Sequence, residues 1–62
     1  MLKLHTEKIE KERKRNSLSK AELARRMGIS RQLLNWTIKH QQLFHVDKFA
    51  DVFDVDAKDL IK

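Results

Sequence analysis

The polar side chains with the most specific chemistry in this 62-residue chain are grouped between residues 30 and 39. Arg31 carries a planar guanidinium whose parallel N–H groups can donate to O6 and N7 of a guanine. Gln32 and Asn35 carry amides, and one such amide can make two hydrogen bonds to an adenine, at N6 and N7. Three such groups within five residues indicate a segment that can read base edges. The alternative is an exposed helix face whose polar groups are merely solvated.

Other side chains near this segment are suited to phosphate. Ser30 and the backbone N–H groups beside it can hold a phosphate at the start of a helix. Lys39, Lys20 and Arg25 supply positive charge, which positions a protein on a nucleic-acid backbone without reading its sequence. For Lys39, phosphate contact and simple solvation both stay open.

Trp36 is the one tryptophan of the chain. On a helical wheel it falls on the same side as Gln32, away from Leu34 and Ile38. There the indole can pack on a sugar or on a thymine methyl group. It can also cover the 40–45 loop with its N–H bonded to a carbonyl. We favour loop packing, because tryptophan is usually highly buried.

Charge is distributed unevenly along the chain. The net charge is +5 and the isoelectric point about 9.9. Residues 1–42 hold eleven Lys or Arg and four acids, a net charge of +7, whereas residues 43–62 hold three and five, a net charge of −2. A basic surface suits a polyanionic partner, and a solvated basic face is the alternative. We favour the polyanion because the basic region contains the base-reading residue types.

Two short helices joined by one turn are predicted to position these side chains, over residues 19–39. Ser19 and Glu22 have the spacing of a capping box, in which each side chain accepts from the backbone N–H of the other. Gly28, the one glycine, suits the left-handed residue that ends a helix. Ser30 then caps the second helix. The predicted core-facing positions are Ala21, Leu23, Ala24 and Met27, then Leu34, Thr37 and Ile38, with Leu33 at the margin.

These residues resemble a known family. Leu-Ser-Lys-Ala-Glu-Leu-Ala at 18–24 and Met-Gly-Ile-Ser at 27–30 are similar to the helix-turn-helix of the Cro and lambda-repressor-like regulators, also called the xenobiotic-response-element type. The resemblance covers about residues 9–60. It implies one compact, all-α, five-helix domain over residues 1–62, whose recognition helix, about 30–39, lies in the DNA major groove. It also implies transcriptional regulation, of repressor type, in bacteria or their phages.

A polar helix is predicted ahead of this motif, with Thr6 as its cap. Ile9 is its strong apolar anchor. Glu12 stands where the resembling family has a large apolar residue, so we expect this helix to be loosely held. The basic run at residues 13–15 either caps the end of the helix or contacts phosphate.

The two ends of the chain complete the predicted domain. Residues 1–5 form a flexible arm, or Leu2 and Leu4 pack onto the core. After a loop at 40–45, a fourth helix is predicted from an apolar repeat at i, i+3, i+4 and i+7. Its members are Val46, Phe49, Ala50 and Phe53. Asp56 then caps a short fifth helix.

The sequence argues against other chemistries. The three histidines lack metal-site spacing and there is no cysteine, so we expect no metal and no cofactor. No nucleophile lies beside a base, and a chain this short encloses little cavity, so an enzyme is not expected. No apolar run approaches the roughly 18 residues of a membrane span, which predicts a soluble, cytoplasmic protein without a membrane partner.

The sequence thus predicts a sequence-specific, double-stranded DNA-binding transcriptional regulator. The rival hypothesis is a small helical protein-interaction module, or an anti-repressor, that keeps the fold and binds a protein partner through Trp36, Leu43 and Phe44. A homodimer would use Leu43, Phe44 or residues near Leu60 and Ile61. Because no separate oligomerisation segment is visible, we expect a free dimer to be weak and most pairing to occur on DNA.

Overall fold

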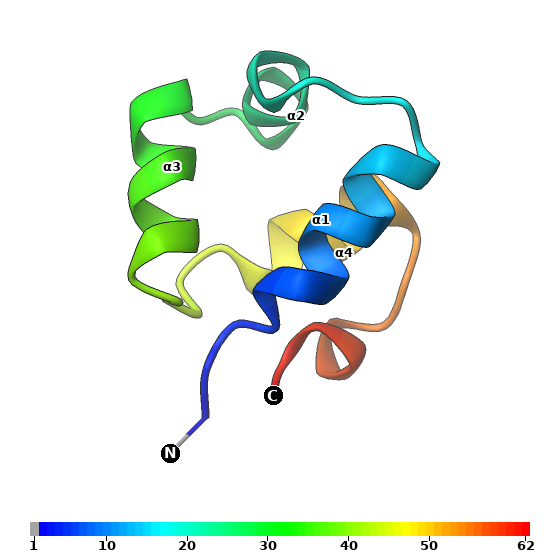
Figure 1. The fold of residues 1–62 in the computed structure, drawn as a ribbon, viewed down its shortest axis with the longest axis vertical. Coiled ribbons are helices and arrows are strands. Elements are labelled where there is room, and N and C mark those ends of the chain that lie inside the picture. Colours follow the sequence, from blue (N-terminus) through cyan, green and yellow to red (C-terminus); the bar gives the residue numbers. More distant parts are fainter. Residues whose placement is uncertain (1) are drawn as a thin grey trace.

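The computed structural model describes residues 2–62 as short helices joined by tight loops (Figure 1). Its elements are α1 (Thr6–Arg15), α2 (Lys20–Met27), α3 (Arg31–Lys39), α4 (Val46–Phe53) and a 3-10 helix (Ala57–Leu60). α1 packs on α4 and on the 3-10 helix, whereas α2 packs on α3 and α4. Figure 1 shows α3 at the edge of the molecule, so one of its sides faces outward.

The core combines apolar side chains from all five helical elements and from the N-terminal segment. Those without exposed surface are Leu4, Ile9, Leu23, Leu34, Phe49 and Leu60. In α4 the predicted apolar repeat is confirmed, with Phe49, Ala50 and Phe53 buried. In α2 the prediction for Ala21 is wrong, because the buried stripe narrows to Leu23, Ala24 and Met27 and leaves Ala21 exposed.

α1 begins one residue earlier than its predicted cap would allow. Thr6 is already helical, and His5 occupies the capping position without a side-chain hydrogen bond. The N–H of His5 donates to the carbonyl of Leu60 (2.8 Å), while its own carbonyl accepts from the N–H of Ile9 (3.1 Å). Pairing with the C-terminal segment therefore determines where α1 starts.

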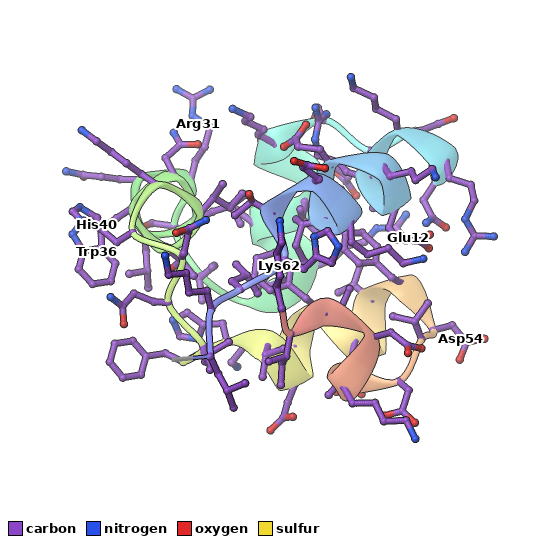
Figure 2. All side chains as sticks on the ribbon, turned by 60° about the horizontal axis from the view of Figure 1, so that its bottom comes forward. Glu12, Arg31, Trp36, His40, Asp54 and Lys62 are labelled. Carbon is purple, nitrogen blue, oxygen red and sulfur yellow. The ribbon has the colours of Figure 1, made fainter. Side chains whose placement is uncertain are left out.

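Charged side chains hold the end of α1. Glu12 is 5% exposed, and its carboxylate accepts from Arg15 (2.6 Å), with Lys8 at 3.9 Å (Figure 2). Arg13 donates to the carbonyl of Leu18 (2.8 Å) and to Glu10 (2.7 Å). The hydrogen bond from Arg13, above all, lowers the pKa of Glu10. Arg13 and Arg15 therefore act within the fold, which favours the capping interpretation of the basic run.

α2 begins and ends largely as the sequence predicts. The Ser19 hydroxyl accepts from the N–H of Glu22 (3.1 Å). The reciprocal half of the predicted capping box does not form, because the Glu22 carboxylate instead accepts charge-assisted hydrogen bonds from Arg25 and Arg26. Gly28 ends the helix at φ 74°, ψ 27°, and the N–H of the next residue, Ile29, reaches back to the carbonyl of Ala24 (3.0 Å).

The predicted fifth helix is a single 3-10 turn, so residues 2–62 form four α-helices and not five. Asp56 caps this turn by accepting from the N–H of Lys58 (3.4 Å). The N–H of Asp59 donates to the carbonyl of Asp56, three residues back, and that of Ile61 to the carbonyl of Lys58. Ile61 is then extended and bridges to Leu4, which prevents another α-turn.

The N-terminal segment packs onto the domain through Leu4. Lys3 and Lys62 exchange two backbone hydrogen bonds (3.1 and 2.8 Å), and the N–H of Leu4 donates to the carbonyl of Gln41 (3.2 Å). Leu4 is fully buried, whereas Leu2 is 66% exposed. Met1 lies outside the described residues. Residues 3–5 thus connect the turn after α3 to the end of the chain, and the segment before α1 lies on the same side of the molecule as the C-terminus in Figure 1.

Replacing Gly28 with valine is expected to lower stability by at least about 1 kcal/mol, since a β-branched residue is strained at positive φ. A Cβ at this position would meet no atom within 4 Å, so the cost should come from the backbone alone. Gly28→Asn is the matched control, because asparagine tolerates the left-handed region. Thermal unfolding followed by circular dichroism measures both. Equal melting temperatures for the two variants would contradict this account of the turn.

Leu4→Ala is expected to destabilise the domain by about 2–5 kcal/mol, because it removes most of a fully buried side chain and leaves a cavity in the core. Leu2→Ala removes the same atoms from an exposed position and should stay within about 0.5 kcal/mol of the parent protein. Urea unfolding of both variants provides the comparison. If the two unfold at the same denaturant concentration, the N-terminal segment does not contribute to the core.

Candidate nucleic-acid interface

α3 is anchored by a cap and a narrow buried side. The Ser30 hydroxyl accepts from the N–H of Leu33 (3.0 Å), as the sequence predicts. Leu34 and Thr37 are fully buried, and Ile38 is partly buried. Thr37 keeps its hydroxyl satisfied by donating to the carbonyl of Leu33 (2.8 Å). The buried side therefore sets the rotation of α3 about its own axis.

The remaining positions of α3 form one continuous exposed surface, which we call the α3 face. It contains every α3 residue for which the sequence predicts a DNA contact, together with the capping serine. These residues are Ser30, Arg31, Gln32, Asn35, Trp36 and Lys39, and each is exposed. Their predicted roles on DNA remain predictions, although the fold brings them together on one side of one helix.

The two cations predicted on α2 are differently engaged. Lys20 is exposed at the first position of α2. Arg25 bonds Glu22 at 2.7 Å, and this hydrogen bond is the largest cause that lowers the pKa of Glu22 and raises that of Arg25. The Arg25 side chain nevertheless remains 77% exposed, so a phosphate can compete for it.

Trp36 lies on the exposed side of α3, next to the end of the helix. Its indole stacks on the imidazole of His40, with ring centroids 4.7 Å apart and planes tilted by 37°. Figure 2 shows both rings on the outer side of α3. The predicted loop packing is therefore limited to the first residue of the 40–45 loop, and the indole is still 43% exposed.

Leu33 was predicted to lie only at the margin of the core-facing side of α3. It is 38% exposed, and with Trp36 it forms the apolar part of a shallow hollow completed by Ser30 and Gln32. An amphipathic pattern does not distinguish a marginal core leucine from one that serves a surface. Its position directly after Gln32 was nevertheless an indication that Leu33 borders the predicted contact residues.

The sequence from α2 through the loop after α3 carries cations and no acid beyond Glu22. No aspartate or glutamate occurs between Glu22 and Asp47, while Arg25, Arg26, Arg31 and Lys39 do. Figure 2 shows Arg31 and Trp36 at one end of the molecule and Asp54 at the other. The α3 face thus lies away from Asp54, while Glu7 and Glu10 line a hollow with Lys20 and Ile38 beside α3.

Within residues 2–62, no three acidic, histidine or cysteine side chains are grouped so that they could hold a metal ion. None of the described helices is long and apolar enough to cross a membrane.

Comparison with known proteins bears on the helix-turn-helix directly. A model of the Cro/C1-type HTH DNA-binding domain matches residues 8–62, nearly the whole chain. The protein belongs to this family. Searches of curated proteins and of solved structures give no match. Membership of the Cro/C1-type family supports a DNA-binding regulator, and α2, Gly28 and α3 lie within the matched residues.

Proposed function

We propose that this protein is a sequence-specific, double-stranded DNA-binding transcriptional regulator of repressor type, with α3 in the major groove. The observation that carries the proposal is the α3 face, where base-reading residue types are exposed together on a helix whose opposite side is buried. The first residues of such a helix contact base edges in helix-turn-helix complexes. We propose that this protein of a bacterium or phage acts in the bacterial cytoplasm, where it binds DNA and catalyses no reaction.

Each polar side chain of the α3 face has a role in this proposal. Arg31 donates two hydrogen bonds to a guanine, at O6 and N7. Gln32 or Asn35 makes two hydrogen bonds with an adenine, at N6 and N7. The Ser30 hydroxyl is already committed to the N–H of Leu33, so its phosphate contact would use the hydroxyl proton.

The cations around the α3 face would bind the phosphate backbone. Lys39 at the end of α3 and Lys20 at the start of α2 carry exposed ammonium groups. Arg25 would exchange its exposed ion pair with Glu22 for a phosphate, and exposed pairs of this kind contribute little stability. These contacts position α3 in the groove without selecting a sequence.

A second candidate is a protein-interaction module, and the exposed side chain of Phe44 favours it. Phe44 is 74% exposed and lines a hollow together with Leu2, Lys3 and Leu43. Salt separates the two functions. Phosphate neutralisation makes log K fall with log salt by about 0.9 per contact, whereas a packed apolar interface responds far less.

Substitutions in the α3 face should separate specificity from affinity. Gln32→Ala and Arg31→Ala are each expected to lose about 1–3 kcal/mol on a selected operator, because a paired hydrogen bond to a base is lost. Each should also relax the base preference at one position. Lys39→Ala should weaken all sequences alike and reduce the salt slope by about one.

These outcomes are measured by titrating an operator, selected from random DNA, and its scrambled version at several salt concentrations. Lys39→Ala is the internal control, since it removes charge from the same helix without removing a base contact. Equal losses on both duplexes for Gln32→Ala and Arg31→Ala would refute the base-reading role.

We also propose that two copies bind together. A single module buries only about 600–1,000 Å² of protein surface on DNA, which gives weak discrimination. Two recognition helices about 34–36 Å apart would read half-sites separated by one helical turn. The full operator should therefore bind cooperatively and more tightly than an isolated half-site. Titration of both duplexes tests this, and identical affinity for the half-site and for each half of the operator would show independent binding.

A further inference from the structure

The α3 face contains an apolar hollow that hydrogen bonding to bases leaves unused. Its floor is formed by Leu33 and Trp36, and Ser30 and Gln32 line the rest. Leu33 is 38% exposed and Trp36 is 43% exposed, although both are large apolar side chains. The indole lies against the imidazole of His40, with ring centroids 4.7 Å apart. A shallow apolar surface thus lies beside Gln32.

The charge around this hollow restricts what can occupy it. The whole stretch from Leu23 to Val46 carries cations but no acid, so the surroundings attract an anionic partner. Three of the four residues that line the hollow, Ser30, Gln32 and Trp36, belong to the α3 face. The occupant should therefore be an apolar group that belongs to a polyanion. It should lie next to a base that Gln32 can contact.

The major groove of DNA displays one apolar group of this kind, the C5-methyl group of thymine. We propose that Leu33 and Trp36 are specificity-determining residues that bind thymine methyl groups in the operator. This inference rests on the proposed function, since it requires α3 to lie in the major groove. It goes beyond that function by assigning sequence selection to two apolar side chains.

The expected effect follows from the burial of one methyl group. Removing a methyl group from water between a leucine and an indole should strengthen binding roughly fourfold. One or two thymines in each half-site should show this effect.

The test replaces single thymines by deoxyuridine in the operator that the wild-type protein selects from random duplex DNA. Deoxyuridine keeps the pairing and the O4 acceptor and removes only the methyl group. We expect a roughly fourfold loss of affinity at one or two positions in each half-site. At the same positions, a cytosine version of the operator should regain a similar factor when its C5 is methylated.

Leu33→Ala and Trp36→Ala are then measured on both the thymine and the deoxyuridine duplexes. In each variant the affinity ratio between the two duplexes should fall clearly below fourfold, because one of the two partners of the methyl group is gone. Phe44→Ala is the matched control, since it removes an exposed aromatic ring outside α3 and should keep the fourfold ratio. Circular dichroism and binding to scrambled DNA show that the variants remain folded.

Three results would overturn the inference. The selected operator could lack thymine in both half-sites, or all of its thymines could tolerate deoxyuridine. The fourfold ratio could also survive in both Leu33→Ala and Trp36→Ala. In each case specific binding to DNA would remain, so the proposed function would stand. Failure to select any preferred sequence would instead reject the proposed function together with this inference.

Discussion

The left-handed backbone at Gly28 is the constraint on which the direction of α3 depends. Because Gly28 ends α2 at φ 74°, the chain reverses within three residues and Ser30 can cap the next helix. Leu34 and Thr37 then enter the core, which leaves the α3 face exposed as a unit. Every proposed base contact is therefore positioned by one backbone conformation and two buried side chains, none of which would touch DNA. A change in the turn would move all of these contacts together.

Residues 3–5 provide a second constraint on α3, from its other end. They pair with the C-terminal segment, and the N–H of Leu4 also donates to the carbonyl of Gln41, just beyond α3. Gln41 has φ 51° and belongs to the turn that follows the helix. The start of α3 is thus positioned by α2, and the residues after it are held by the two chain ends. A domain of this size buries a limited core, so such backbone pairing is a substantial part of what keeps α3 in place.

Arginines in this protein fall into two groups with different roles. Arg13 and Arg15 bond Glu10, Glu12 and a backbone carbonyl, and they stabilise the end of α1. Arg31 stands on the α3 face, where no acid is near in sequence. Arg25 lies between these cases, because Glu22 holds it in an exposed pair that a phosphate can replace. A count of positive charges cannot separate these groups, since their roles depend on which carboxylates the fold brings within reach.

Local chemistry in the sequence was sufficient for the four α-helices, for the turn at Gly28 and for the exposure of the polar residues on one side of α3. Caps, glycine and apolar spacing act within a few residues, so they can be read without a fold. The start of α1 at His5, the single 3-10 turn and the burial of Leu4 were decided by pairing between segments more than fifty residues apart in the chain. The hollow formed by Leu33 and Trp36 likewise depends on how α3 packs against the core. This packing buries Leu34 and Thr37 and leaves Leu33 partly exposed. Periodicity indicates which side of a helix is buried, but only tertiary packing determines how wide that side is.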